Sequence, residues 1–480
     1  MTLLGIDLGT TSVKAAVYRD DGTRVAGAAR GHTTRRPAPG WAEQDPSDWW
    51  GGLCGVVAEL DAAGALGGLD GIGVCSQVNT HVVTDAGGAA LHPAITWQDR
   101  RCADVAAGLT ARLDDATRAA VRGGLGTVDP THPAARAAWL AAHAPGVWER
   151  SRWVLAPKDQ LLLRLTGVAV ADPISSIGLV DAGGTYPAWL DAVVPGLTGR
   201  LAPLGDPAAL VGETTGAGGL PPGVPVAHGT MDAWSSLLGG GIAAPGDAID
   251  VAGTSEVLAM AAGPGGGAPG IVTFPTWRGL HVHAGPTQAG GDALAWASRM
   301  LGLDLPSALT TAAGAGPGCG GVLFLPQLSG ERAPLWDPHL RAHWLGATFD
   351  TGPAELARAG MEGVAHAARH VLEVLEQAAG TTAGSLAVCG GGSASDLWCQ
   401  IKADVLDRPL RRTAERDAGV LGAAVLAGLA VGGGSLADLT DRMVAVEREF
   451  TPDPSTRGVY DDAHGRYRGA QRDLAAMFVP

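Results

Sequence analysis

Short apolar runs separated by glycine- and hydroxyl-rich turns open the chain. Leu3–Leu8 and Ser12–Arg19 each have the length and apolar content of a strand, and a tight turn at residues 9–11 lies between them. A second turn at Asp20–Gly22 precedes a further strand at Thr23–Ala29. This opening segment therefore predicts a β-meander.

The same strand–turn–strand pattern returns near the middle of the chain. The string IDLGTTSV that begins at Ile6 is echoed by IDVAGTSEV from Ile249, 243 residues later. Repetition at half the chain length predicts two similar domains, which we place at residues 1–242 and 243–480. Each domain would offer a turn rich in hydroxyl and amide groups, and two such facing turns would form an interdomain nucleotide cleft.

Apolar residues spaced three and four apart predict helices elsewhere in the chain. A long helix spans Glu355–Ala379, and Gly380 follows it in the position of a C-cap. A shorter helix includes Leu161–Leu165. The uncharged run Ala418–Gly434 is short and rich in alanine and glycine, so it predicts a buried packing helix rather than a membrane span.

The composition is that of a globular protein with an acidic balance. The 480 residues are 46% hydrophobic and 17% charged, which allows packed cores in two or three domains. A formal net charge of −14 argues against a surface for nucleic acid or anionic membrane, which needs clustered Lys and Arg. The six cysteines contain no C-x-x-C pair, so we expect reduced, mostly buried thiols. The first residues lack the features of a signal peptide, and a cytoplasmic location is expected.

The turn after the first strand has the groups needed to bind a phosphate. Backbone N–H groups in a glycine turn form an anion-binding concavity, and threonine hydroxyls add donors. Asp7, at the end of the preceding strand, is a candidate ligand for Mg²⁺, which prefers oxygen atoms. An ordinary hairpin is the alternative, and the second turn of the same kind favours phosphate binding. The candidate phosphate-binding residues are Gly9, Thr10, Thr11, Lys14, Gly253, Thr254 and Ser255.

A third glycine cluster lies between an apolar strand and a helix predicted at Asp396–Ala403. A glycine turn at that place lets a flat ring or a ribose approach the backbone closely. Such turns are common, and the two hydroxyl-rich turns described above strengthen the case for nucleotide binding at this one. Its candidate residues are Gly391, Gly392 and Ser393.

Asp232 follows an apolar strand and precedes a helix of small residues predicted at Ala233–Leu238. A carboxylate at a strand end can act as a general base towards a bound hydroxyl. Aspartate also serves well as the N-cap of a helix. The residue chemistry alone leaves both interpretations open.

A second group of polar residues follows another apolar strand. Gln77 and Asn79, the single asparagine of the chain, would bind sugar hydroxyls there, with a plain turn as the alternative. Trp97 would offer a stacking face to a polyol, and Asp99 a polar partner.

Taken in chain order, these motifs resemble those of the FGGY carbohydrate kinases, sugar kinases with the actin, hexokinase and Hsp70 type of fold. The resemblance covers nearly the whole chain, which makes it more specific than any single motif. It includes further stretches of the types E-Q-x-P-x-x-W-W, W-x-D-x-R, K-D-x-L with L-T-G, and G-E-R-x-P. In this chain they stand at Glu43–Trp50, Trp97–Arg101, Lys158–Gly167 and Gly330–Pro334.

The resemblance implies an α/β fold with two actin-like, ribonuclease H-like domains that flank an interdomain nucleotide and sugar cleft. It implies ATP and Mg²⁺ as cofactors and a small ketose or polyol as substrate. The default reaction converts D-xylulose to D-xylulose 5-phosphate. Residues 1–242 would bind sugar and phosphate, and residues 243–480 adenosine and phosphate. Dimers are common among proteins that resemble this one, so a homodimer is among the expected assemblies.

The resemblance also assigns roles to the candidate residues. Asp232 would be the catalytic base and would contact the substrate, while Asp7 would hold Mg²⁺. The two hydroxyl-rich turns would bind phosphates, and the third glycine cluster adenosine. The sugar pocket would contain Gln77, Asn79, Trp97 and Asp99.

Several positions depart from the family pattern and leave the sugar open. Arg136 stands where lysine is usual, and Ala233 where D-xylulose kinases tend to have asparagine. Val78–Thr80 replaces the Met-His-Gly of D-xylulose kinases and also lacks the Arg-Glu of glycerol kinases. Ribulose, L-xylulose, erythritol-type polyols and glycerol are therefore alternative substrates. A weakly catalytic, nucleotide-dependent sugar sensor is a further alternative, which the retention of Asp7 and Asp232 disfavours.

Overall fold

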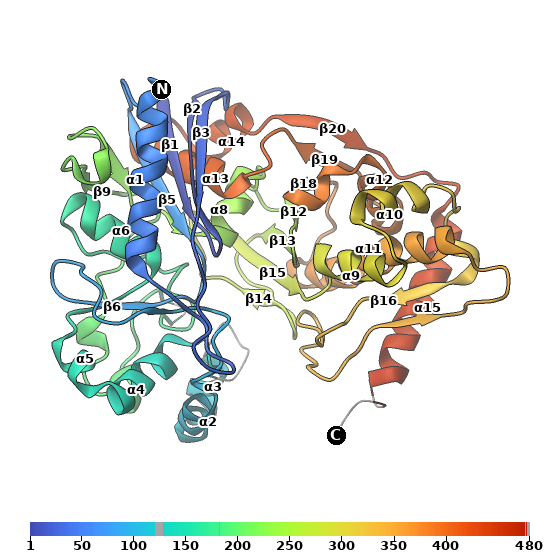
Figure 1. The fold of residues 1–480 in the computed structure, drawn as a ribbon, viewed down its shortest axis with the longest axis horizontal. Helices are drawn as coiled ribbons and strands as arrows, with labels where there is room; N and C mark the ends of the chain where they lie inside the picture. The colour runs from blue at the N-terminus through green and yellow to red at the C-terminus, as the bar shows by residue number, and fades with distance from the viewer. Residues whose placement is uncertain (121–127, 182, 476, 478–480) are drawn as a thin grey trace. The chain divides into compact units, whose positions relative to one another are not determined.

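A computed structural model of the chain describes residues 1–120, 128–181, 183–475 and 477 (Figure 1). The contacts divide it into two compact units, the first made of Met1–Gly241 with Asp417–Val444 and the second of Ile242–Arg416 with Ala445–Pro480. One segment of the expected second domain, Asp417–Val444, thus packs within the first unit. The expected division of binding roles between residues 1–242 and 243–480 stays a prediction.

The first unit is built on a seven-stranded sheet of order β3-β2-β1-β5-β10-β9, with β11 paired to β5. Strands β1 and β2 are antiparallel, whereas β1, β5, β10 and β11 run parallel to one another. Its strands are β1 (Thr2–Leu8), β2 (Ser12–Arg19), β3 (Arg24–Gly31), β4 (Glu43–Gln44), β5 (Gly71–Ser76), β6 (Val82–Thr84), β7 (Ala94–Ile95), β8 (Trp153–Leu155), β9 (Leu210–Glu213), β10 (Pro225–Ala227) and β11 (Thr230–Met231). Its helices are α1 (Pro46–Ala62), α2 (Ala103–Arg112), α3 (Asp115–Ala120), α4 (Pro133–His143), α5 (Pro145–Arg150), α6 (Pro157–Thr166), α7 (Trp189–Val193), α8 (Asp232–Gly239), α13 (Ala418–Ala430) and α14 (Leu436–Met443).

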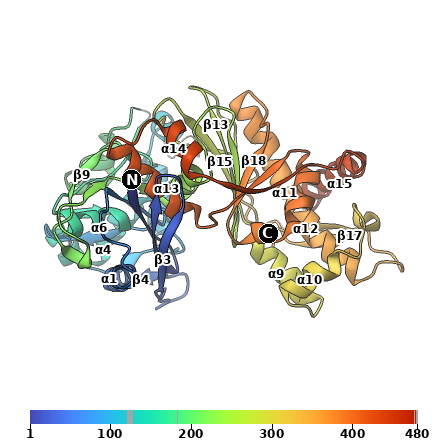
Figure 2. The ribbon, with the colours of Figure 1, turned by 90° about the horizontal axis from the view of Figure 1, so that it is seen from above.

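Helices cover both faces of this sheet because alternate residues of a strand point to opposite sides. Leu4 and Ile6 on β1 join a buried cluster with Trp49 and Leu53 of α1. Gly5 lies between Leu4 and Ile6 and faces α13. A Cβ added at Gly5 would lie 2.0 Å from the carbonyl oxygen of Val420 in that helix. Figure 1 shows α1 alongside β1 to β3, and Figure 2 shows α13 close to the N-terminus of the chain. Helix α13 therefore completes the core of the first unit.

The second unit repeats this plan with a seven-stranded sheet of order β14-β15-β13-β12-β18-β19-β20. Helices α11 and α12 share a buried cluster with β12, β13 and β18, and Figure 2 shows them beside β18. Its strands are β12 (Ala248–Ala252), β13 (Glu256–Ala262), β14 (Val272–Thr273), β15 (His281–Thr287), β16 (Leu323–Leu325), β17 (His343–Leu345), β18 (Leu386–Cys389), β19 (Leu410–Thr413) and β20 (Val446–Phe450). Its helices are α9 (Gly291–Met300), α10 (Leu305–Ala312), α11 (Pro353–Ala379), α12 (Asp396–Leu406) and α15 (Arg457–Ala475).

The predicted elements are confirmed. The opening meander is β1 to β3, and its echo is β12 and β13. The long helix is α11, and Gly380 follows it as the C-cap with a left-handed φ of 66°. Two α/β units with related sheets are the expected fold class. Five of the six cysteines are buried and all six are free thiols.

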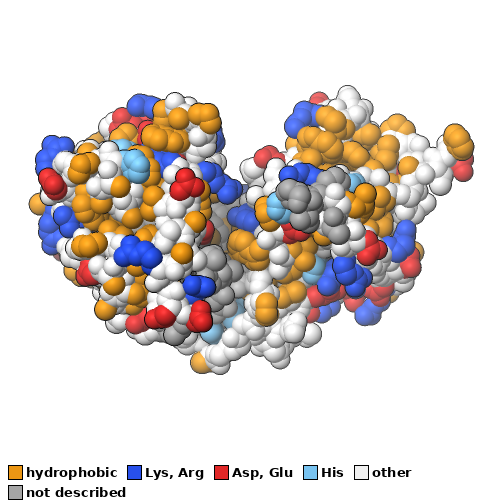
Figure 3. All heavy atoms as spheres, turned by 90° about the horizontal axis from the view of Figure 1, so that it is seen from below, with side chains coloured by type: hydrophobic (Ala, Val, Ile, Leu, Met, Phe, Trp, Pro, Cys, Tyr) orange, Lys and Arg blue, Asp and Glu red, His pale blue; other side chains and the backbone are white. Residues whose placement is uncertain are grey.

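The run predicted as a packing helix is α13, which is buried along nearly its whole length. Among the helices of the described residues, none combines the length and apolar character that crossing a membrane requires. On the face shown in Figure 3, Lys and Arg side chains are interspersed with acidic and hydrophobic ones.

Candidate functional site

Strand register brings the two candidate carboxylates of the first unit together. Asp7 on β1 pairs with Cys75 on β5, and Thr230 on β11 pairs with the same Cys75 from the other side. Asp232 follows β11 directly, as the first residue of α8. Because the three strands are parallel, their carboxyl ends share one edge of the sheet. Asp7 and Asp232 therefore both lie at this edge.

Burial raises the pKa of both carboxyls, and the charge of Asp7 adds to the shift of Asp232. Burial is the main cause that raises the pKa of Asp7 to about 6, and the Cys75 thiol, which donates to Asp7 Oδ1 across 3.4 Å, opposes the shift. Burial also raises the pKa of Asp232 to about 7, with the negative charge of Asp7 as the second cause. A carboxyl that titrates near neutral pH can both accept and release a proton there.

Asp232 does not act as the N-cap of α8. Met231 occupies that position, and Asp232 Oδ1 accepts a hydrogen bond of 2.7 Å from the backbone N–H of Ala233. This bond fixes one carboxylate oxygen at the start of the helix. The other oxygen has the lone pairs that a base towards a bound hydroxyl needs.

Hydrogen bonds within the turn after β1 and from His32 hold this turn in shape. Gly9 N–H donates to the carbonyl of Ser12, and the His32 ring bonds the Gly9 carbonyl at 3.0 Å. The backbone N–H of His32 donates to the carbonyl of Thr11, which itself is exposed. The turn thus keeps its shape without a ligand, as an anion-binding loop requires.

Lys14 lies opposite Asp7 in the β1–β2 pair but is engaged elsewhere. Its Nζ contacts Asp417 Oδ1 at 2.5 Å, just before α13 begins. The ion pair with Asp417 therefore competes with the phosphate contact that we expect for Lys14. Asp417 lies 403 residues from Lys14, so no local pattern in the sequence links the two.

The candidate sugar residues differ in how accessible they are. Trp97 is 39% exposed, whereas Gln77 is buried, with its amide bonded to Gln44 and Thr80. Asn79 has a left-handed φ of 52°, a conformation that asparagine tolerates better than most residues.

Asp99 is buried and its carboxylate is already occupied. Both oxygens bind the Arg101 guanidinium, and Oδ2 also accepts from the backbone N–H of Ala42. The carboxylate of Asp99 is thus engaged with protein groups, and its contact with a sugar stays a prediction.

Arg136, noted above only as a departure from a pattern, supports the Asn79 turn. It is buried, and its guanidinium donates to the backbone carbonyls of Asn79 and Thr96 and contacts the His81 ring. The planar fork of arginine can serve several acceptors at once, which a lysine ammonium cannot match in geometry.

In the second unit, the two candidate nucleotide loops also meet at one sheet edge. Strands β12 and β18 are parallel neighbours, and they end before the turn 253–255 and the loop 390–393. Gly390 has a φ of 85°, and an added Cβ would lie 2.6 Å from the Ala252 carbonyl oxygen. Gly391 is exposed and borders open space, whereas the buried Ser393 uses its hydroxyl to bond Gly390. The bare backbone at Gly391 is therefore the accessible part of this loop.

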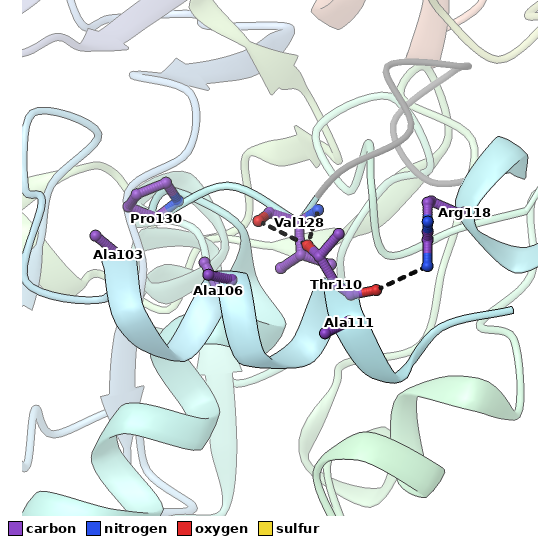
Figure 4. A pocket seen from close by; sticks show the side chains of 8 residues that line it. Ala103, Ala106, Thr110, Ala111, Arg118, Val128 and Pro130 are labelled. Atoms are coloured by element: carbon purple, nitrogen blue, oxygen red, sulfur yellow. Dashed lines mark hydrogen bonds between the residues drawn. The ribbon is translucent and has the colours of Figure 1, made fainter. Parts of the chain in front are cut away.

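A hollow of about 530 Å³ in the first unit is a separate feature (Figure 4). It lies along α2, and none of the candidate site residues lines it. Its cation, Arg118, donates to the carbonyls of Thr110 and Leu113. Half of the lining residues are alanine, and the lining offers few groups for a phosphate or a sugar. Its lining residues are Ala103, Ala106, Ala107, Thr110, Ala111, Arg118, Val128 and Pro130.

Known proteins resemble this chain over almost its full length. It is 31% identical to xylulose kinase of Escherichia coli (strain K12), covering 99% of this chain and 100% of that protein. It is 34% identical to glycerol kinase of Alkalilimnicola ehrlichii, covering 90% of each. Among solved structures, a "xyloylose kinase" from Brucella ovis superposes with a TM-score of 0.91 at 32% identity, covering 99% of this chain and 100% of that one.

Family profiles match both halves. The FGGY family of carbohydrate kinases, N-terminal domain, matches residues 2–239, and the C-terminal domain of the same family matches residues 248–431. Fold, site geometry and these matches agree: the chain belongs to the FGGY family of carbohydrate kinases.

Proposed function

We propose that this protein transfers a phosphoryl group from ATP to a hydroxyl of a small ketose or polyol, with D-xylulose 5-phosphate from D-xylulose as the first reaction to test. The observation that carries the proposal is the Asp7–Asp232 pair at the edge of β1, β5 and β11. The pKa of Asp232, raised to about 7, makes this carboxylate basic enough to accept a hydroxyl proton near neutral pH.

The residues present fit both cofactors. Asp7 is an oxygen donor beside a second carboxylate, and Mg²⁺ is usually bound through one or two carboxylates with waters and phosphate oxygens. The turns 9–11 and 253–255 offer backbone N–H and hydroxyl donors to phosphates, and the exposed backbone at Gly391 leaves room for a flat base. When bound, ATP supplies the phosphoryl group and Mg²⁺ neutralises phosphate charge.

Each side chain then has a defined task. Asp232 accepts the proton of the attacking hydroxyl through the oxygen that Ala233 does not hold. Thr10 and Thr11 donate to phosphate oxygens, while the exposed face of Trp97 orients the carbon chain of the sugar. The first unit binds the acceptor and phosphate, and the second unit adenosine and phosphate.

D-Xylulose is favoured by two relatives that share nearly the whole chain, the kinases of E. coli and B. ovis. Glycerol is the second candidate because several relatives are named glycerol kinases. The Val78–Asn79 sequence argues against glycerol, since the Arg-Glu typical of glycerol kinases is missing. The neutral amide of Asn79 both donates and accepts hydrogen bonds, which suits a ketose with several hydroxyls.

The test is ADP release from ATP over a panel of pentuloses, tetruloses, polyols and glycerol. We expect D-xylulose to give the highest kcat/KM, and Asp232→Asn to lower kcat by about 10²- to 10⁴-fold while ATP still binds. Activity on only another member of the panel would support the assignment as a kinase and replace D-xylulose as the assigned substrate. Near-normal turnover by Asp232→Asn would remove Asp232 as the base.

A further inference from the structure

Five residues around the turn after β1 form a closed ring of hydrogen bonds. Trp97 donates from its backbone N–H to the Thr80 hydroxyl and from its indole Nε1 to the Thr10 hydroxyl, at 3.3 and 3.0 Å. Thr80 donates to Gln77 Oε1, and Gln77 Nε2 donates to Gln44 Oε1 at 2.7 Å. Gln44 Nε2 closes the ring on the Thr10 carbonyl at 2.8 Å. The ring joins three residues of the sugar side to the phosphate turn.

Gln44 is the fixed point of this ring. It is 1% exposed, and its amide makes two further bonds outside the ring, accepting from Trp49 Nε1 and donating to the Thr34 hydroxyl. Both N–H groups and both lone-pair directions of the amide are therefore used. The reversed amide would place N–H groups against the donors of Trp49 and Gln77. Only one orientation of Gln44 satisfies its neighbours.

The ring also decides what Thr10 offers to a ligand. Its hydroxyl oxygen accepts from Trp97, so its own proton is turned away from the indole and can be donated to an anion. The same Trp97 shows a partly exposed face, where the C–H groups of a polyol can pack. A ligand that orders Trp97 thereby orders the donor of Thr10.

We infer that Gln44 is a positioning residue that couples acceptor binding at Trp97 to the geometry of the phosphate turn at Thr10. This rests on the proposed function, because Trp97 and Thr10 have ligands only if the protein is a kinase of this kind. Gln44 itself touches neither ligand. It holds its two neighbours in the ring, Gln77 and Thr10, at a fixed separation. Buried, fully bonded networks of this type are rigid.

The coupling is measured as a ratio of dissociation constants. We would determine the Kd of the ATP analogue AMP-PNP with Mg²⁺, with and without whichever of D-xylulose and glycerol the wild-type chain phosphorylates. We expect the acceptor to tighten AMP-PNP binding in the wild type, and Thr80→Val or Gln44→Met to reduce that ratio about 3- to 10-fold. The double variant should lose little more than either single one, because a ring is broken by its first missing bond.

Thr34→Val is the matched control. It also removes a hydrogen bond to the Gln44 amide, but one outside the ring, so the ratio should stay at the wild-type value. A purely structural role would shift both dissociation constants together and leave the ratio unchanged. A wild-type ratio in Thr80→Val, or a ratio of one in the wild type, would overturn the inference.

A second measurement tests the ring even if neither acceptor is phosphorylated. Solvent exchange of the Trp97 indole N–H, followed by NMR in ¹⁵N-labelled protein without ligands, should be faster in Thr80→Val than in Thr34→Val. Equal exchange in the two variants would show that the ring does not hold Trp97. Failure of the kinase assay together with the expected exchange would reject the proposed function and keep the ring.

Discussion

The two halves of the chain use the same aspartate in different ways. Asp7 and Asp250 occupy equivalent places in the repeated strand–turn–strand pattern. Asp250 is buried and contacts Lys402 Nζ at 2.7 Å, and the same ammonium contacts Glu256. Lys14, opposite Asp7, instead pairs with Asp417. A buried ion pair neutralises Asp250. Of the two equivalent aspartates, Asp7 is therefore the one left for a metal or phosphate site.

The raised pKa of Asp232 predicts a cost in stability that depends on pH. A carboxyl whose folded pKa lies near 7, above its ordinary 3.8, destabilises the folded state increasingly as pH rises from about 3.8 to about 7, because in that range only the unfolded chain gives up the proton. Asp232→Asn should therefore stabilise the first unit at pH 8 by about 1–3 kcal/mol, and by almost nothing at pH 3, where the carboxyl is protonated in both the folded and the unfolded chain. Urea unfolding at the two pH values measures this. An equal gain at both would contradict the assigned cause.

At the scale of elements, glycines set how closely helix α13 approaches its neighbours. A Cβ on Gly73 of β5 would lie 1.8 Å from the Ala423 carbonyl oxygen, and one on Gly239 of α8 would lie 1.9 Å from that of Ala418. These are backbone-to-backbone approaches that no side chain can accommodate by changing rotamer. The glycine content of the chain, which the sequence shows only as an abundance, is here a condition for the contact of a helix with a sheet.

Gly73→Ala should therefore destabilise the first unit strongly. Overpacking of a rigid core typically costs about 1–3 kcal/mol, and a clash with backbone is at the upper end. Gly67→Ala is the matched control, because a Cβ at Gly67 would meet nothing within 4 Å. Thermal unfolding should show a lower Tm for Gly73→Ala and a wild-type value for Gly67→Ala. Equal values for the two would mean that α13 is not packed as described.

The acid sensitivity of α15 is a second prediction at this scale. His366 of α11 is buried, with its ring tilted against those of His464 and Tyr467 of α15, and burial holds its pKa well below the ordinary value. A histidine with a lowered pKa stabilises the fold above pH 6.5 and loses that contribution as pH falls, because the unfolded chain takes up the proton first. Arg369 and Arg466 add to the repulsion of a charged ring.

His366→Phe should therefore make the second unit less sensitive to acid. The free energy of unfolding of the wild type should fall between pH 6.5 and pH 5 by more than that of the variant, as followed by urea unfolding. Met300→Leu, at an exposed position of the same unit, would serve as the comparison variant. An identical pH dependence in wild type and His366→Phe would contradict the prediction.

At the scale of the whole molecule, the first unit is discontinuous in sequence. The chain leaves it after Gly241, forms most of the second unit, and returns with Asp417–Val444. The points where the chain leaves and re-enters each unit are close together. In the first unit, Gly239 lies against Ala418. In the second unit, the backbone N–H of Ala414 donates to the carbonyl of Ala445. Each crossing therefore joins points that are close together within one unit.

A fragment of residues 1–241 should accordingly fail to fold cooperatively, because one face of its sheet would be uncovered. The same fragment joined through a short Gly/Ser linker to residues 417–444 should fold, since Gly239 and Ala418 are already neighbours. Circular dichroism with urea unfolding distinguishes the two. A cooperative transition in the fragment of residues 1–241 alone would show that α13 is dispensable.

The sequence by itself determined the meander, its echo, the long helix and the family, because these depend on periodicity and on short motifs that are read locally. It also named the residues at the strand ends that form the candidate site, including Asp7 and Asp232. Only the tertiary structure decided that Asp417–Val444 belongs to the first unit, that Asp417 pairs with Lys14, and that Asp99 is occupied by Arg101. These contacts join residues far apart in the chain or depend on how a side chain is oriented, and no local pattern encodes either. The shift of the pKa of Asp232 to about 7 has the same origin, since burial and a neighbouring charge exist only after folding.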